Sequence, residues 1–275
     1  MRAMNPVNWL IDSLNFINHI YLKKHILYEL TKRDFKQKYV VNIMGLAWAV
    51  LDPIAMMLIF WLVFGVGMRV GEHMGVPFVA YLITGLSAFM FFSQTLAAGT
   101  ASIKAYSFLL KKVDFMISMV PLVKIFSEIT LHLIVLAITM IIIMANGIHP
   151  SFYWLQVVYY IFAASMLLLS LSWLAASISL FFPDISIIIS ILLRLLFYIT
   201  PVFWSETMFS PKTIFILKFN PIYYIVQGYR QSFLYGQPFW MSWRYTLYFW
   251  TLTFICFIVG ITVFRKLRPH FADVV

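Results

Sequence analysis

Long apolar runs separated by short polar stretches dominate the chain, and this pattern predicts membrane-spanning helices. A helix needs roughly 20 apolar residues to cross the hydrocarbon core of a bilayer. Six runs reach or approach this length, at about 42–68, 77–100, 119–145, 152–181, 185–204 and 246–264. We therefore expect an all-α polytopic membrane protein with six transmembrane helices.

Two short apolar pieces lie between the fifth and sixth runs, within 205–236. Ser210 begins the first piece and Asn220 the second, and each is followed by proline. Ser and Asn are favoured N-cap residues, and proline suits the first helical position because no N–H is needed there. Neither piece can span a bilayer, so we expect two short re-entrant helices that line a cavity, as in a transporter or channel.

The first 41 residues are too polar to span a membrane. Apolar residues recur at helical spacing near the start, at Leu10, Leu14, Ile17 and Tyr21. This spacing predicts an amphipathic helix in the membrane interface, followed by a basic helical stretch over 22–39. We expect an interface segment over 1–41 and one membrane domain over 42–275.

Charge distribution predicts how the helices are oriented. Of 20 lysines and arginines, seven precede the first run, four lie within 104–124 and three follow the last run, whereas five fall on the opposite side. Positive residues concentrate on the cytoplasmic side of membrane proteins. Both termini are therefore predicted to be cytoplasmic, and the re-entrant pair to face outward. The net charge of +10 is assigned to the membrane surface, and no nucleic-acid partner is expected.

Composition supports this class and excludes several others. The chain has 63% hydrophobic and 11% charged residues. It has no phosphate-binding loop, no H-E-x-x-H motif and no Cys/His cluster, so we expect no catalytic, cofactor or metal site. The single cysteine, Cys256, is expected to be a small buried hydrophobe. Any energy source must then lie on another chain.

Four ionisable residues in or near the apolar runs are candidates for function, because such groups are costly inside a membrane. Asp52 precedes Pro53 and could cap a helix break, whereas Glu128 and Asp184 lie near predicted interfaces. Arg194 lies near the middle of its run. Arg194 either contacts a partner group along a water-filled path or serves in helix packing.

Aromatic residues make up 19% of the chain, more than interfacial belts of Trp and Tyr require. Aromatic faces give apolar contact to the C–H faces of sugars, although lipid-facing packing explains them as well. The loop over 101–119 mixes lysines with aromatics and predicts a short helix lying flat under the membrane. Its apolar side either docks on another protein or forms an ordinary interfacial turn.

Several segments resemble the membrane subunits of type-2 ABC exporters, the polysaccharide-export permeases in particular. They are Met44-Gly45-Leu46-Ala47-Trp48 with Asp52-Pro53, Phe182-Pro183-Asp184 on to Thr200-Pro201-Val202-Phe203-Trp204, and Phe219-Asn220-Pro221-Ile222-Tyr223-Tyr224 with Gly228-Tyr229-Arg230. Gly75-Val76-Pro77-Phe78-Val79 and His270-Phe271-Ala272-Asp273 look most like wall teichoic acid exporter permeases. The family often has Arg before the acid corresponding to Asp184, whereas this chain has Pro183.

The resemblance implies a homodimer bound to two copies of a cytoplasmic ATPase, which holds ATP and Mg; this chain itself carries no cofactor. The complex would move an undecaprenyl-diphosphate-linked wall teichoic acid across the bacterial plasma membrane, with the re-entrant pair as a lid over the exit. Alternative cargoes are O-antigen, capsule polysaccharide or a small hydrophobic compound. An integral membrane enzyme acting on polyprenyl carriers and a passive channel are more distant alternatives. Clustered acids or histidines and a polar ring motif, which these would need, are missing from the sequence.

Three groups of site residues follow from these expectations. Basic residues that could attract the lipid diphosphate and membrane headgroups, at roughly 1 kcal/mol each, or that simply mark the cytoplasmic side, are Lys23, Lys24, Arg33, Lys36 and Lys38. The resemblance assigns coupling to the ATPase to Tyr106, Phe108, Leu109, Lys111, Lys112 and Phe115. Candidates for the translocation path are Trp48, Asp52, Trp61, Phe89, Arg194, Tyr198 and Trp204.

Overall fold

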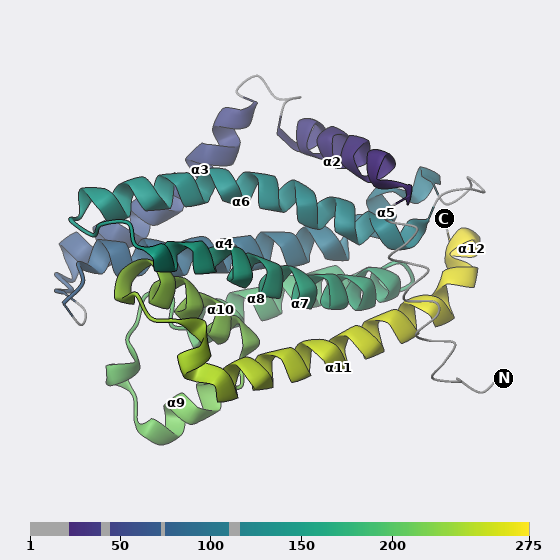
Figure 1. Cartoon of the computed structure of the whole chain (residues 1–275). Helices are drawn as coiled ribbons and strands as arrows, with labels where there is room; N and C mark the ends of the chain where they lie inside the picture. The colour runs from purple at the N-terminus through teal and green to yellow at the C-terminus, as the bar shows by residue number, and fades with distance from the viewer. Residues whose placement is uncertain (1–21, 40–44, 73–74, 110–115, 275) are drawn as a thin grey trace.

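The computed structural model describes residues 22–39, 45–72, 75–109 and 116–274, and this part of the chain is helical, with no β-strand (Figure 1). The longer helices are α2 (Lys24–Tyr39), α3 (Leu46–Phe60), α4 (Phe78–Thr100), α6 (Val120–Ala145), α7 (Gln156–Ser179), α8 (Asp184–Ile199) and α11 (Trp243–Leu267). Short helices are α5 (Ser102–Ala105), α9 (Pro211–Leu217), α10 (Pro221–Arg230) and α12 (Phe271–Val274). The predicted all-α class is confirmed.

Short 3₁₀-helical and π-helical segments join and extend these helices. The 3₁₀ turns are η2 (Ser107–Leu109), η3 (Ile117–Met119), η4 (Phe152–Leu155), η5 (Glu206–Met208), η7 (Phe239–Ser242) and η8 (Arg268–His270). The π-helical segments are η1 (Trp61–Gly67), which continues α3, and η6 (Gln231–Tyr235), which continues α10. Because α3 runs unbroken through Pro53, the helix break expected at Asp52 is not present, and the irregular part of this helix comes later.

Within the described residues, five helical stretches, and not six, are long and apolar enough to cross a membrane. They are Val50–Gly67, Phe78–Thr100, Ile117–Ala145, Phe152–Ser179 and Phe239–His270. The run expected to span at 185–204 forms α8, which has 16 residues and is about 24 Å long at 1.5 Å per residue. Its helix ends at Ile199, so α8 is shorter than a bilayer core of about 30 Å. The count of six spans is not confirmed.

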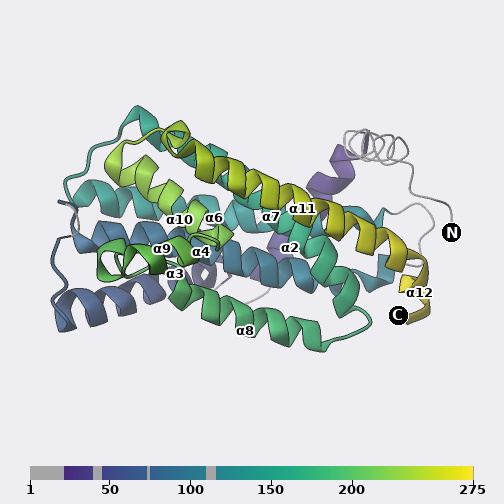
Figure 2. The same cartoon turned by 90° about the horizontal axis from the view of Figure 1, so that it is seen from below.

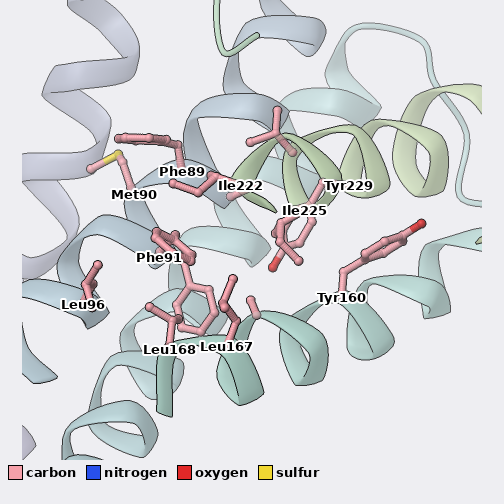
Figure 3. Packing of buried hydrophobic residues seen from close by; sticks show 14 of the residues in the cluster. Phe89, Met90, Phe91, Leu96, Tyr160, Leu167, Leu168, Ile222, Ile225 and Tyr229 are labelled. Atoms are coloured by element: carbon pink, nitrogen blue, oxygen red, sulfur yellow. The ribbon is translucent and has the colours of Figure 1, made fainter. Parts of the chain in front are cut away.

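Helix α4 forms the centre of the molecule. In the most apolar stretch of each helix, 83% of the residues are buried in α4 but only 11% in α3 with η1. Phe89, Met90 and Phe91 of α4 pack with Leu167 and Leu168 of α7 in the main apolar core (Figure 3). Helices α3, α6, α7 and α8 pack against α4, whereas α11 packs on α7 and α2 on α6. Helices α3 and α8 lie on the same side of the molecule (Figure 2).

Glycines allow two of these helices to approach α7 closely. A Cβ atom on Gly99 of α4 would lie 2.0 Å from the Ser172 hydroxyl oxygen, and one on Gly260 of α11 would lie 2.4 Å from the Ser170 carbonyl. Small residues at such crossings let helix backbones pack tightly without a hydrophobic driving force from water. The packing of α4, α7 and α11 therefore depends on the absence of side chains at these positions.

The short helices α9 and α10 lie at one end of the molecule, while α2, α5 and α12 lie in the other half (Figure 1). The predicted N-caps are confirmed: Ser210 accepts a hydrogen bond from the Thr213 amide at 3.3 Å, and Asn220 accepts one from the Ile222 amide at 3.0 Å. The Asn220 amide also donates to the Thr200 hydroxyl at 2.8 Å. This bond ties α10 to the end of α8. The re-entrant placement of α9 and α10 in a membrane stays a prediction.

Candidate functional site

Helices α3 and α8, with η1, present a largely exposed apolar surface, here called the α3/α8 face. Its large exposed side chains include Trp48, Leu51, Leu58, Trp61, Leu62, Ile188, Ile191, Leu192, Leu195 and Tyr198. The two helices meet through aromatic rings, because the Phe60 ring of α3 lies 5.3 Å from the Phe197 ring of α8. An exposed apolar surface of this extent marks contact with lipid or with another protein.

The seven path candidates fall into two sets. Five are exposed side chains on α3, η1 and α8, namely Trp48, Asp52, Trp61, Arg194 and Tyr198. The other two, Phe89 and Trp204, are buried beneath them. Phe89 packs edge-on against Phe197 at 5.2 Å, and the Trp204 indole donates to the Tyr198 carbonyl at 2.9 Å. Phe89 and Trp204 therefore support this surface from below.

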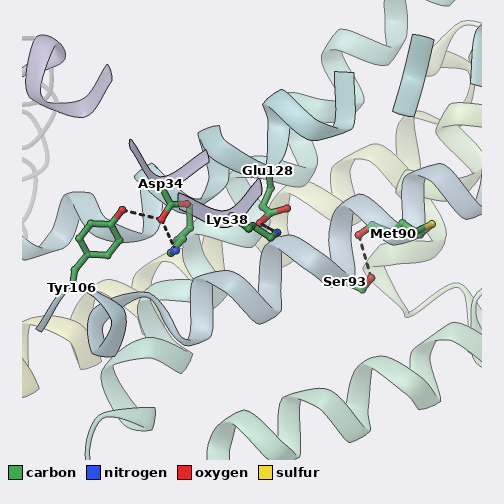
Figure 4. A network of polar contacts seen from close by, with 7 residues as sticks. Asp34, Lys38, Met90, Ser93, Tyr106 and Glu128 are labelled. Atoms are coloured by element: carbon green, nitrogen blue, oxygen red, sulfur yellow. Dashed lines mark hydrogen bonds and ion pairs between the residues drawn. The ribbon is translucent and has the colours of Figure 1, made fainter. Parts of the chain in front are cut away.

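A second candidate site joins α2 to α6 through buried acids (Figure 4). The Asp34 carboxylate of α2 accepts hydrogen bonds from the Tyr106 hydroxyl at 2.8 Å and from the Lys124 ammonium at 2.5 Å. One turn further along, Lys38 of α2 pairs with Glu128 of α6. Both carboxylates are buried, Asp34 at 5% and Glu128 at 3% exposure. Because a buried acid is costly without its partner, these pairs hold α2 in one register on α6.

Apolar contacts add to the polar contacts of Asp34 and Glu128 at this junction between α2 and α6, which we call the α2 anchor. Leu27 packs with Tyr106, Met119, Val120 and Val123 in a small separate cluster. Burial, and then the charge of Asp34, raises the pKa of Tyr106. The Tyr106 phenol thus remains protonated and acts as the donor. The α2 anchor therefore connects three segments: α2, the turn after α5, and the start of α6.

The structure separates the five basic candidates of α2 by environment. Lys24, Arg33 and Lys36 are exposed and Lys23 is half-buried, whereas Lys38 contacts Glu128. Their attraction for lipid headgroups stays a prediction.

Among the coupling candidates, the buried Tyr106 ring packs near the exposed Phe108 ring, with centroids 6.0 Å apart. Leu109 ends the η2 turn. Lys111, Lys112 and Phe115 lie outside the described residues. Tyr106 is therefore the one coupling candidate that the structure shows to be an internal contact of the α2 anchor.

Arg230 was not among the predicted site residues and was counted only as one of the five basic residues on the side opposite the termini. Arg230 is fully buried at 0% exposure. Its guanidinium donates to the Val202 carbonyl at 2.8 Å and lies 3.5 Å over the centre of the Tyr81 ring. A Cβ atom on Gly85 would lie 2.5 Å from one guanidinium nitrogen. The helical spacing of the sequence could have indicated that Arg230 is buried, because Arg230 shares a face of α10 with Tyr223 and Val226.

Histidines show no ligand-like arrangement in the part of the chain that the structure describes. His132 is buried and bonds the Tyr229 hydroxyl at 2.8 Å, while its ring stacks on Phe91 at 4.4 Å. Within the described ranges, no three His, Cys, Asp or Glu side chains are grouped so that they could hold a metal ion.

The fold and the α3/α8 face define a polytopic helical membrane protein with surfaces suited to assembly and transport. Comparison with known proteins identifies the family: the model for ABC-2 type transporters matches residues 26–234. The chain therefore belongs to the ABC-2 type transporter family.

Two relatives have the same name. The O-antigen export system permease protein RfbA of Klebsiella pneumoniae is 26% identical over 251 residues, which cover 90% of this chain and 94% of the relative. The O-antigen export system permease protein RfbA of Myxococcus xanthus is 25% identical over 223 residues, which cover 80% of this chain and 84% of the relative. Both relatives align along most of their own length and with most of this chain.

Proposed function

We propose that this chain is the permease subunit of an ABC exporter that moves a polyprenyl-diphosphate-linked polysaccharide across the bacterial plasma membrane. The observation that carries the proposal is the exposure of Asp52 and Arg194 on the apolar α3/α8 face. Ionisable side chains at membrane depth are costly when they face lipid. A second protein surface or a wet path therefore covers this face in the working complex.

A second copy of the chain is the proposed cover. Two α3/α8 faces, related by two-fold symmetry, would enclose a path between the copies, and isologous contact is the usual form of homodimer. Trp48, Trp61 and Tyr198 would then offer apolar contact to the C–H faces of a sliding glycan without fixing one orientation. The buried Phe89 and Trp204 would hold these helices in place from beneath.

The cargo is proposed by class. Resemblance of short motifs led us to expect wall teichoic acid, whereas the relatives are named for O-antigen export. Similarity over most of the chain is stronger support than short motifs, so an O-antigen-type polysaccharide is the proposed cargo. Both cargoes share a glycan attached to a lipid diphosphate, and the exposed lysines and Arg33 of α2 suit that anionic group.

The energy source is proposed to be a separate ATPase with ATP and Mg, in two copies. The α2 anchor supports this, because its contacts join α2 and the turn carrying exposed Phe108 into one rigid platform. The basic residues of α2 lie in the half of the molecule opposite α9 and α10 (Figure 1). By the positive-inside rule this half would face the cytoplasm, and both termini are proposed to be cytoplasmic.

The proposal is tested with the chain and its ATPase reconstituted in liposomes. Lipid-linked O-antigen should stimulate ATP hydrolysis and become accessible to a lectin outside the vesicle, and lipid-linked teichoic acid should do so less. Stimulation by small hydrophobic compounds but by neither glycan would contradict the proposal.

A variant in the path sharpens this test. Arg194→Leu should reduce glycan transport about tenfold or more while the ATPase still co-purifies, since Arg194 would line the wet path. Lys212→Leu is the matched control, because Lys212 is an exposed cation of α9 away from the α3/α8 face. Equal transport by the two variants would remove Arg194 from the path.

A further inference from the structure

A cavity of about 240 Å³ lies inside one copy of the chain, at the end that holds α9 and α10. Its wall includes Tyr81, Glu206, Lys218, Tyr223, Gln227 and Tyr245. These residues come from α4, α10 and α11 and from the segment between α8 and α10. None of the exposed path candidates on the α3/α8 face lines this cavity. It is therefore a separate feature from the proposed path between two copies.

Glu206 organises the polar part of the wall. Its carboxylate accepts a hydrogen bond from the Gln227 amide at 2.9 Å, and its second oxygen lies 3.4 Å from the Lys218 ammonium. The acid and the cation balance each other, so the wall offers donors and acceptors with little net charge. Such a wall favours a ligand with hydroxyl groups over an ion.

The Tyr223 hydroxyl is the most informative atom of the wall. Tyr223 is buried at 1% exposure, and within the described residues its hydroxyl has no partner at hydrogen-bonding geometry. Glu206 and Gln227 lie near this hydroxyl and interact with it at looser geometry. Buried polar groups are normally hydrogen-bonded, and each exception needs an explanation. An occupant of the cavity that bonds this hydroxyl supplies one.

Aromatic rings give the cavity its second property. Tyr81, Tyr223 and Tyr245 line it, and Lys218 and Tyr245 also line a neighbouring groove of about 300 Å³. The groove is built mainly from the rings of Phe215, Phe219 and Tyr248. A pyranose ring has hydroxyl groups around its edge and apolar C–H faces. The combination of polar wall and flanking rings matches both.

We infer that this cavity binds one pyranose unit of the exported glycan, with the adjoining groove taking the next unit. This inference rests on the proposed function. The volume is below the roughly 300–1,000 Å³ of pockets that enclose drug-sized ligands, which suits a single sugar unit. The Tyr223 hydroxyl and the Gln227 amide bond the sugar hydroxyls, and the half-buried Tyr245 ring contacts one of its faces. The site holds the polymer at the end of the molecule where α9 and α10 lie.

The inference is tested by saturation-transfer NMR on the purified chain in nanodiscs, with free neutral hexoses and N-acetylhexosamines as probes at millimolar concentration. At least one probe should bind. Tyr223→Phe should weaken that binding about tenfold, the effect of losing one good hydrogen bond. It should leave the unfolding temperature nearly unchanged, because the removed hydroxyl has no partner at hydrogen-bonding geometry in the described residues. Gln227→Leu is a second variant with the same expected loss of binding.

Tyr153→Phe is the matched control, since Tyr153 is half-buried in η4 and does not line the cavity; its binding should equal that of the unchanged chain. Absence of binding for every probe, or binding by Tyr223→Phe and Gln227→Leu that equals binding by the unchanged chain, would overturn the inference and leave water as the occupant. Glycan-stimulated ATPase activity separates the two proposals. Stimulation without sugar binding contradicts the cavity site alone, whereas sugar binding without stimulation contradicts the proposed exporter alone.

Discussion

Two arginines show how burial and partners decide the role of a charge. Arg194 drew attention because it lies in the middle of an apolar run, yet its side chain is exposed on α8. Arg230 was counted only among the basic residues of the side opposite the termini, yet it is the buried one. Burying a guanidinium is tolerated only where carbonyls or rings replace water. Val202 and Tyr81 provide these partners, and Gly85 provides the space.

Gly85→Ala tests that arrangement. The added methyl group would lie 2.5 Å from the Arg230 guanidinium and 3.0 Å from the Val202 carbonyl oxygen. Overpacking of this kind costs about 1–3 kcal/mol, so the free energy of unfolding measured by denaturant titration in detergent should fall by that amount. Gly71→Ala is the matched control, because nothing lies within 4 Å of its added Cβ. Equal stability of the two variants would show that Arg230 can move away.

At the scale of elements, α2 is the helix whose position depends most on a few polar contacts. It is mostly exposed, and its hold on α6 consists of the Asp34 and Glu128 pairs with the Leu27 cluster. Core helices such as α4 are instead held by apolar packing along their whole length. A helix attached through few groups can shift as a unit when those groups change. This property suits a segment that transmits ATPase movement.

Asp34→Asn should loosen α2. The amide would leave the Lys124 ammonium, 17% exposed, without its acid, and removing one partner of a buried pair costs about 3–5 kcal/mol. Hydrogen exchange of the α2 amides should speed up at least about tenfold, and less ATPase should co-purify. Glu29→Gln serves as control, since Glu29 is an exposed acid on the same helix. If exchange in α2 is the same in both variants, the α2 anchor does not depend on Asp34.

At the scale of the whole molecule, two flanks are exposed but differ in chemistry. The exposed side of α11 carries Leu247, Phe254, Ile255, Ile258 and Val259, and no acidic or basic residue lies between them, as expected for contact with lipid. The α3/α8 face is equally apolar but includes Asp52 and Arg194. This difference favours the α3/α8 face for contact between copies.

Cysteine cross-linking tests this assignment in membranes. Single cysteines replacing Ile188, Leu192 or Leu195, in a Cys256→Ser background, should give covalent dimers with a short bismaleimide at one or more positions. Ile258→Cys on α11 is the control and should stay monomeric on denaturing gels. Dimers through α11 alone would contradict the proposed arrangement.

Local patterns predicted most of the helices and several of their details. Apolar runs predicted α4, α6, α7 and α11 to within a few residues, and the Ser210 and Asn220 caps were predicted correctly. These features depend on neighbouring residues along the chain, so the local sequence is sufficient to predict them. The span predicted at 185–204 was not confirmed, because the apolar run continues past Ile199 although the helix ends there.

The sequence by itself determined the class of protein, since apolar length and the lack of a phosphate-binding motif act locally along the chain. Only the tertiary structure decided which polar groups meet. Asp34 and Lys124 are 90 residues apart in sequence, and Arg230 and Tyr81 are 149 apart. The periodicity of apolar residues in the sequence does not predict such pairs, because they form only when separate helices pack side by side. Burial then determines whether each charge is anchored, as Arg230 is, or left exposed, as Arg194 is.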